Sequence, residues 1–126
     1  MKSCLIVEDS KVIRMVARKI LQGLRFDTSE AADGTEALDA CKAQLPDVVL
    51  LDWDMPVLDG MEFLIELRKL SGGDAPAVVC CTTETEIKYI QKAIECGANE
   101  FIMKPFDSDI IQRSSLKLAF SKIFYS

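Results

Sequence analysis

The sequence contains no histidine, and this absence excludes several classes of function. A Ser-His-Asp hydrolase and a metal centre with histidine ligands both require an imidazole. A chain without histidine also cannot carry a phosphohistidine of its own. The sequence has no apolar run long enough to cross a membrane, and its first residues lack the pattern of a secretory signal peptide. We therefore expect a cytoplasmic protein.

Basic residues are fewer than acidic residues. The chain has 15 Lys and Arg against 20 Asp and Glu, which gives a net charge of −5. Because nucleic-acid phosphates bind to clustered basic residues, and the basic residues here are interspersed with acids, we expect no nucleic-acid partner. The cysteines show no zinc-type spacing and fall mostly in apolar patterns, which predicts buried, reduced thiols. They are Cys4, Cys41, Cys80, Cys81 and Cys96.

The length and composition predict a single domain covering residues 1–126. Apolar residues make up 49% of the 126 residues, which is enough for one sheet and its covering helices. We find no internal repeat, linker or low-complexity tract.

The most informative stretch is residues 47–60, with the sequence DVVLLDWDMPVLDG. Its apolar run, residues 48–51, is too short for a buried helix and is typical of an interior strand of a parallel sheet. Pro56 lacks a backbone donor and prevents the strand from continuing far. Asp52 is therefore predicted to lie at the carboxyl end of a central strand, where open α/β sheets bind ligands.

Strand and helix patterns alternate along the whole chain. Strands are predicted at residues 5–7, 26–31, 48–51, 77–81 and 100–103. Helices are predicted from the cap Ser10 to Gly23, at 34–44, at 59–70, from about 87 to Gly97, and from Asp107 or Ser108 onward. The first helix has Val12, Ile13, Val16 and Ile20 at helical spacing, and the fourth has Ile87, Ile90 and Ile94 on one face. This alternation predicts an α/β sandwich of three layers with right-handed crossovers.

The ends of four predicted strands carry side chains that suit phosphate chemistry. These are Glu8 and Asp9 after the first strand, Asp52 after the third, Thr82 after the fourth and Lys104 after the fifth. Each alone has an ordinary structural explanation, but all of them meet at one edge of a parallel sheet. Three clustered carboxylates repel each other, so the site is expected to hold protons or a hard cation, of which Mg²⁺ fits best.

These motifs resemble the receiver domain of two-component response regulators, particularly stand-alone receivers of the chemotaxis type. The resemblance covers about residues 2–118. It rests on IVEDS at 6–10, LLDWDMPVLDG at 50–60, Thr82 and Thr83 at the end of the fourth strand, and GANEFIMKPF at 97–106. It implies a flavodoxin-like, doubly wound (βα)5 fold with strand order 2-1-3-4-5. It also implies that Asp52 accepts phosphate from a histidine kinase or a histidine phosphotransfer protein.

The residue types suggest how such a site works. We assign Asp9 and Asp52 as direct Mg²⁺ ligands and Glu8 as a ligand through water, and the resemblance adds the backbone carbonyl of Asp54. Asp52 would attack phosphorus as the nucleophile, while Lys104 neutralises charge on the phosphoryl oxygens. We expect a signalling phosphoacceptor rather than an enzyme, able to take phosphate from small donors and to lose it to water.

A phosphoryl group would draw the Thr82 hydroxyl and the Thr83 amide towards Asp52. As the family pattern implies, this movement lets Phe101 turn from an exposed to a buried position. The surface made by the fourth helix, the fifth strand and the fifth helix would then change its affinity for a protein partner. That surface carries Lys88, Tyr89, Lys92 and Phe101.

Two further acidic residues, Asp54 and Glu84, flank the expected path of the attacking water. We hypothesise that they tune the lifetime of the acyl phosphate. Residues 119–126 extend beyond the usual end of the family, where they finish the last helix or form a dimer or partner contact. We expect a monomer or a weak dimer.

Other functions for the same residues remain open at this point. Asp52-Trp53-Asp54 also fits the D-x-D motif of haloacid-dehalogenase-type phosphohydrolases, but there the further acidic pair normally follows the nucleophile. A receiver that docks without phosphorylation would lack some acceptor, metal or lysine position, and all are occupied here. A flavodoxin would need a Ser/Thr/Gly-rich phosphate loop after the first strand, which the sequence lacks.

Overall fold

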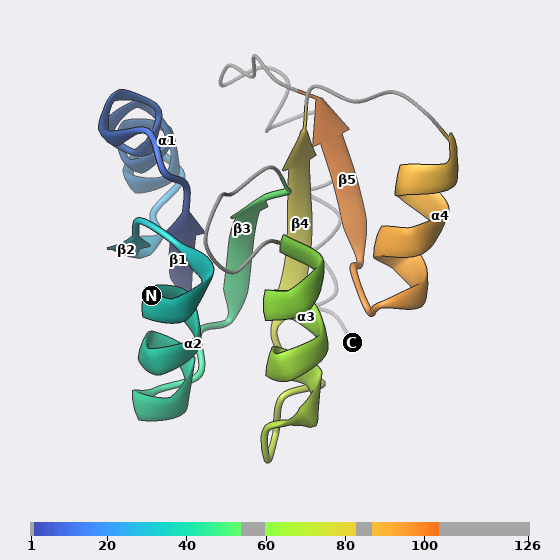
Figure 1. Cartoon of the computed structure of the whole chain (residues 1–126). Helices are drawn as coiled ribbons and strands as arrows, with labels where there is room; N and C mark the ends of the chain where they lie inside the picture. The colour runs from blue at the N-terminus through green and yellow to red at the C-terminus, as the bar shows by residue number, and fades with distance from the viewer. Residues whose placement is uncertain (1, 54–59, 83–86, 104–126) are drawn as a thin grey trace.

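The computed structural model describes residues 2–53, 60–82 and 87–103 of the 126-residue chain (Figure 1). Five strands and four helices alternate along these residues. They are β1 (Ser3–Val7), α1 (Lys11–Gly23), β2 (Asp27–Ala31), α2 (Gly34–Ala43), β3 (Val48–Asp52), α3 (Gly60–Lys69), β4 (Ala77–Thr82), α4 (Ile87–Glu95) and β5 (Glu100–Met103). The last helix, predicted from Asp107 or Ser108 onward, lies outside the described residues.

The strands form one parallel sheet with the order β2-β1-β3-β4-β5. This confirms the order that the resemblance implied. Every residue of β3, the central strand, is buried, as the unbroken apolar run predicts. The prediction for β5 matches the structure residue for residue, and the other strands differ from their predicted ends by one or two positions.

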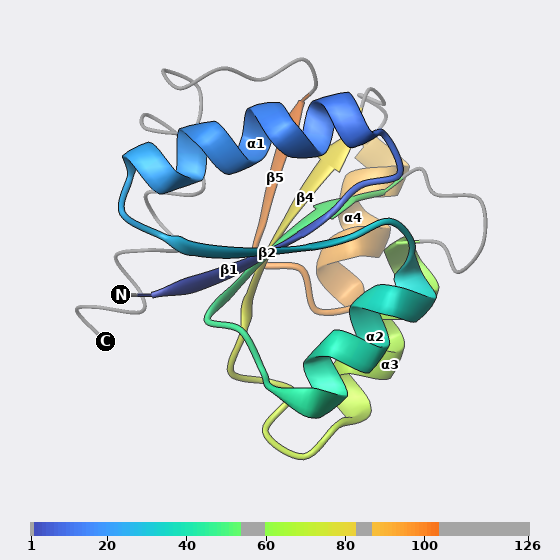
Figure 2. The same cartoon turned by 90° about the vertical axis from the view of Figure 1, so that its left-hand side faces the viewer.

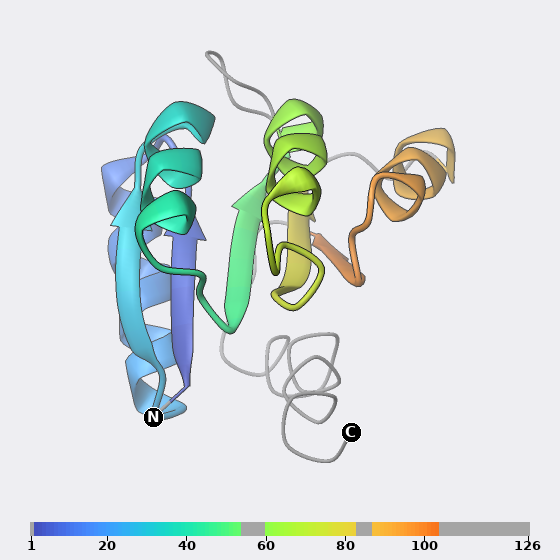
Figure 3. The same cartoon turned by 90° about the horizontal axis from the view of Figure 1, so that it is seen from below.

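The helices cover both faces of the sheet. Figure 2 shows α1 on one face and α2, α3 and α4 on the other, and Figure 3 shows these three helices side by side in a row across the sheet. Each face has its own hydrophobic core, because successive side chains of a strand point to opposite faces. Cys80 and Cys81 follow this rule and lie in different cores, so they do not form a chelating pair.

The five cysteines are free thiols, as predicted, and all but the partly buried Cys96 are buried. Burial raises the pKa of Cys4 and of Cys80 to about 12 and the pKa of Cys41 to about 11. A thiol with such a pKa stays protonated at neutral pH, and the nucleophile is the thiolate. These cysteines therefore act as small apolar core residues.

The structure changes the apolar faces expected for two helices. Ala17 and Leu21 make the buried contact of α1 with the sheet, whereas Val12 and Val16 are 64% and 45% exposed. Among the side chains of α4 that the structure describes, those of residues 90–95, Ala93 is buried and Ile94 is 56% exposed. In both cases the sequence offers more apolar positions than one face of a helix can turn towards the sheet.

The turn after α1 contains a left-handed backbone conformation that was not predicted from the sequence. Arg25 has φ of 68°, in the left-handed region that disfavours residues with a Cβ atom. The turn returns the chain to the core, since the next residue, Phe26, is only 3% exposed.

We therefore expect Arg25→Gly to stabilise the protein by about 0.5–1 kcal/mol, since glycine adopts this φ freely but costs more backbone entropy on folding. Urea unfolding with an unchanged slope would measure the gain. Arg25→Ala is the matched control, because it removes the same side chain but keeps the Cβ atom. Equal stability of the two variants would contradict the prediction.

Among the described residues, no helix is both long enough and apolar enough to span a bilayer.

Candidate acidic site at the carboxyl edge of the sheet

Three carboxylates meet at the carboxyl edge of the sheet. Glu8 and Asp9 follow β1 directly, and Asp52 is the last residue of β3, the strand beside it. Carboxylate oxygens of the three residues lie within 4.8 Å of one another. The sequence predicted this cluster because the carboxyl ends of neighbouring parallel strands lie at the same edge.

The cluster is unevenly exposed. Glu8 and Asp52 are buried, at 4% and 3% exposure, whereas Asp9 is exposed. Buried carboxylates that lie so close together are favourable only with a compensating charge, proton or hydrogen bond. A hard divalent cation with oxygen ligands, such as Mg²⁺, suits this donor set, and the exposed side at Asp9 leaves room for its remaining waters.

The backbone and the side chain of Glu8 are both fixed by hydrogen bonds. Its N–H donates to the carbonyl oxygen of Ala31, at 3.1 Å, and so extends the pairing of β1 with β2. Its side-chain Oε1 accepts from the N–H of Ser10, at 3.2 Å. Its carbonyl oxygen accepts from Nη1 of Arg14, at 2.7 Å. The acidic residue therefore sits in a defined place between β2 and the start of α1.

Ser10 has a second function at the same point. Its side chain accepts the backbone N–H of Ile13, at 3.3 Å, and so caps α1 as the sequence predicts. The loop between β1 and α1 is only Glu8, Asp9 and Ser10, and its first and last residues are hydrogen-bonded to neighbouring elements.

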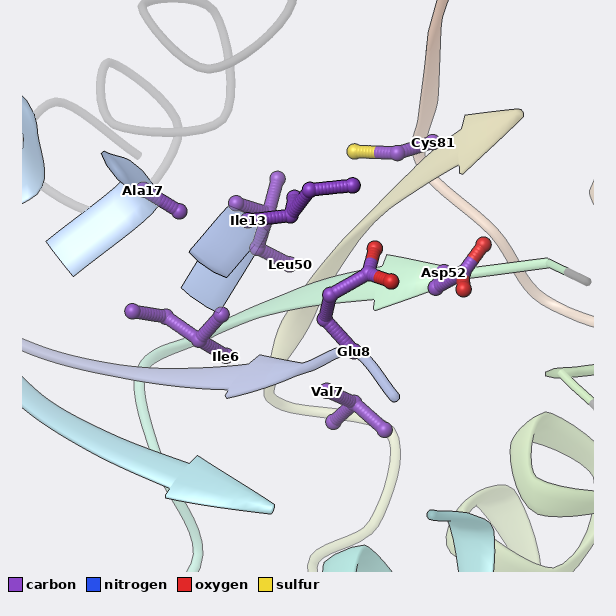
Figure 4. A pocket seen from close by; sticks show the side chains of 8 residues that line it. All are labelled: Ile6, Val7, Glu8, Ile13, Ala17, Leu50, Asp52 and Cys81. Carbon is purple, nitrogen blue, oxygen red and sulfur yellow. The ribbon is translucent and has the colours of Figure 1, made fainter. Parts of the chain in front are cut away.

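A small cavity lies next to the two buried acids (Figure 4). Glu8 and Asp52 both line it, together with apolar side chains such as Ile6, Leu50 and Cys81. Its volume is about 10 Å³. This is room for about one water-sized group between the two acids and the mostly apolar side chains under α1.

Trp53 follows Asp52 and fixes the end of β3. Its indole is 9% exposed and belongs to the core under α3, and its backbone N–H donates to the carbonyl of Cys81, at 2.9 Å. Gly60, the first residue of α3, packs directly on this corner. A Cβ atom there would lie 3.0 Å from Trp53 Cα and 3.1 Å from the carbonyl oxygen of Asp52. A glycine at this position lets α3 begin against the strand that carries Asp52.

Two of the remaining predicted site residues lie within the described part of the chain. Thr82 ends β4 one position beyond Cys81, the register partner of Asp52, so its backbone lies at the same edge. Phe101 on β5 is partly buried against the core under α3 and α4. Asp54, Thr83, Glu84 and Lys104 lie outside the described residues, as do the side chains of Lys88 and Tyr89, and their roles stay predictions.

Arg14, whose guanidinium contacts the acidic loop, was not predicted from the sequence. One signal was present. Arg14 and Arg18 are four residues apart, hence on one side of α1, and Glu30 lies on the strand next to β1. Recognising the contact required knowing that β2 pairs with β1.

The fold and the acidic edge together define a flavodoxin-like α/β protein with a candidate cation site beside one buried aspartate. A family model described as "Response regulator receiver domain" matches residues 4–114. The chain belongs to this family, and it is CheY-like. Receiver domains are signalling phosphoacceptors of two-component systems, so membership sets aside the phosphohydrolase and flavodoxin alternatives.

Individual relatives agree with this family. Protein CcdB of Bacillus subtilis is 37% identical over 108 residues, which cover 85% of this chain and 88% of that protein. The structure of chemotaxis protein CheY4 of Vibrio cholerae has a TM-score of 0.86 and 31% identity and covers 98% of both chains. The receiver domain of sensor histidine kinase PA1611 of Pseudomonas aeruginosa has a TM-score of 0.85 and 26% identity, also with 98% of both chains covered. That structure has a magnesium ion coordinated in its active site cleft.

Proposed function

We propose that the chain is a phosphoacceptor in a two-component phosphorelay, with Asp52 as the residue that is phosphorylated. A histidine kinase or a histidine phosphotransfer protein is the donor, since this chain has no histidine of its own. The observation that carries the proposal is the cluster of Glu8, Asp9 and Asp52, in which Asp52 ends a fully buried central strand.

Magnesium is the proposed cofactor. Asp9 and Asp52 would hold it directly, Glu8 through a water, and the backbone carbonyl of Asp54 would complete the protein ligands. The close carboxylate oxygens and the magnesium in the PA1611 receiver support this assignment. When bound, the ion supplies positive charge at the phosphoryl oxygens and compensates the repulsion among the acids.

Asp52 acts as the nucleophile on phosphorus. Its backbone carbonyl lies close to Gly60, the first residue of α3, which fixes the end of the strand that carries the nucleophile. Lys104 places a second positive charge near the transferred group. We expect small phosphoryl donors to react at the same site as the donor protein.

Phosphorylation then changes a distant surface. The new oxygens accept hydrogen bonds from Thr82 and Thr83, and Phe101 repacks as Thr82 moves. The changed surface consists of α4, β5 and the predicted fifth helix, with Lys88, Tyr89 and Lys92 as contact residues for a protein target. Asp54 and Glu84 set the lifetime of the acyl phosphate. We place this activity in the cytoplasm and expect a monomer or weak dimer.

Trp53, the only tryptophan, reports on the site because it is adjacent to Asp52. Its fluorescence is expected to change on addition of Mg²⁺ and again on addition of acetyl phosphate or a beryllofluoride mimic. Intact-mass spectrometry should show one phosphoryl group per chain after acetyl phosphate with Mg²⁺, and none after chelation of the metal. A chain that forms no adduct with Mg²⁺ and either acetyl phosphate or a phosphorylated kinase domain would contradict the proposal.

A further inference from the structure

We infer that Arg14 is a positioning residue for the acidic site, and that it sets the affinity for Mg²⁺ by fixing the backbone of Glu8 against β2. The part that concerns Mg²⁺ rests on the proposed function. The mechanical part, that Arg14 holds the loop of Glu8, Asp9 and Ser10 in place, stands on the contacts alone.

Arg14 makes two bonds that join three elements. Its Nη1 donates to the carbonyl oxygen of Glu8 at 2.7 Å, and its Nε donates to Oε1 of Glu30 at 3.3 Å. The side chain of Arg14 is 16% exposed and its bond to Glu8 is partly buried, whereas the bond to Glu30 is exposed to water. A charged donor on a backbone carbonyl forms one of the stronger hydrogen bonds in proteins. Arg14, on α1, therefore links the end of β1 to β2.

Glu30 is itself held from a second side. Its Oε2 accepts from Nη1 of Arg18, one turn further along α1, at 3.0 Å. The neighbouring residue, Ala31, accepts the N–H of Glu8. The end of β2 therefore holds Glu8 twice: directly at its N–H, and through Arg14 at its carbonyl.

This arrangement matters because the loop carries two of the three clustered acids. Carboxylates within 4.8 Å repel each other, and a three-residue loop without support would relieve that repulsion by moving outward. The bond from Arg14 falls on the carbonyl oxygen of Glu8 rather than on a carboxylate oxygen. Arg14 therefore restrains the loop without competing with a cation for its ligands, as outer groups do at metal sites.

Electrostatics and positioning predict opposite signs for removing Arg14. A positive charge near a cation site repels the cation, so losing that charge alone would tighten Mg²⁺ binding. Losing the restraint would weaken binding, because the cation would then have to bring the acids together itself. An increase or a decrease in Mg²⁺ affinity on removal of Arg14 therefore shows which of the two effects dominates.

The test is a Mg²⁺ titration followed by Trp53 fluorescence in Arg14→Met and Arg18→Met. The second is a matched control: it removes the same charge from the same side of α1 and the same contact with Glu30, whereas the bond to the carbonyl of Glu8 comes from Arg14. We expect Arg14→Met to raise the Kd for Mg²⁺ about tenfold and Arg18→Met to change it less than about twofold. Binding by Arg14→Met as tight as that of the parent, or tighter, would overturn the inference.

A second measurement needs no metal. In metal-free protein, amide hydrogen exchange of Glu8 and Ser10 should accelerate in Arg14→Met and stay unchanged in Arg18→Met, while amides of β3 keep the exchange of the parent. Unchanged exchange at Glu8 and Ser10 refutes the restraint whatever the metal does. If instead the parent neither binds Mg²⁺ nor accepts a phosphoryl group, the proposed function fails, and the exchange data still decide on Arg14.

If urea unfolding shows that Arg14→Met is not folded, the same measurements can be made on Arg14→Lys. Lysine keeps the charge, but all its N–H groups lie on one nitrogen, whereas Arg14 reaches Glu30 from Nε and Glu8 from Nη1. We expect its Kd for Mg²⁺ to rise about threefold, with faster exchange at Ser10. Parent-like values for both quantities would overturn the inference.

Discussion

Asp52→Asn is expected to lose phosphorylation completely, with no adduct detectable by intact-mass spectrometry after acetyl phosphate and Mg²⁺. The amide has the shape of the carboxylate but is no nucleophile at neutral pH. Glu8 and Asp9 cannot replace it, because they follow β1, whereas Asp52 ends β3. The expected loss is at least about 100-fold in rate, beyond that of a residue that only assists the transfer.

The same substitution should separate metal binding from folding. It removes one of three carboxylates, so Mg²⁺ affinity is expected to fall by about tenfold or more. Without divalent cations the variant should be at least as stable as the parent in urea, because one charge leaves a crowded cluster. Asp39→Asn, the same change at a position of α2 outside the cluster, is the control and should leave adduct formation and metal affinity unchanged. If Asp52→Asn formed as much phosphoryl adduct as the parent, the phosphoacceptor would be a residue other than Asp52.

Arg68→Met is expected to destabilise the protein by about 3 kcal/mol, a larger effect on stability than that expected for Arg25→Gly. The guanidinium at the end of α3 donates to the carbonyl oxygens of Gly73 and Pro76, both at 2.8 Å, and to that of Gly97 at 2.6 Å. It also donates to the side chain of Asn99, at 3.1 Å. One side chain thus ties the loop after α3 to the loop that leads from α4 into β5.

The cost of removing Arg68 exceeds the contribution of one bond because several carbonyls lose a charged donor together. Burial lowers the pKa of Arg68 and Asp74 opposes this, so part of the favourable interaction offsets desolvation of the charge. Asn99 also contacts the sheet: its Oδ1 accepts the N–H of Val78, at 2.7 Å. Loss of Arg68 should therefore loosen the edge strand β5 as well as the loop.

Lys69→Met is the matched control for Arg68→Met. Lys69 is the next residue of α3, and its side chain is 67% exposed with one ion pair to Glu66, at 3.3 Å. Such a surface pair contributes little, so we expect a change below about 0.5 kcal/mol. The two free energies of unfolding in urea would be compared at the same ionic strength. If Arg68→Met also stays within that range, the carbonyl contacts do not stabilise the fold.

Local order along the chain determined most of the fold. The apolar run of β3 and its end at Asp52 were predicted from the pattern of apolar residues and the following proline. The cap Ser10 was predicted from its position before a helical pattern. The alternation of strands and helices followed from the same reasoning. The strand order, in contrast, came from resemblance to a known family, because the sequence pattern alone does not state which strands are neighbours.

The candidate site was also predicted from the sequence only in part. The sequence brought Glu8, Asp9 and Asp52 together, since parallel strands share one carboxyl edge, and the structure confirms their proximity. The roles of Asp54, Thr83, Glu84 and Lys104 remain predictions.

Tertiary structure alone decided the partners of Arg14 and Arg68 and the inward side of α1. The bonds of Arg14 to Glu30 and of Arg68 to Gly97 span 16 and 29 residues of sequence. Ala17 rather than Val16 faces the sheet because the direction of a helix axis is set by everything that it packs against. Periodicity is a property of neighbouring residues and can be read from their order, whereas contacts between distant segments exist only once the chain has packed.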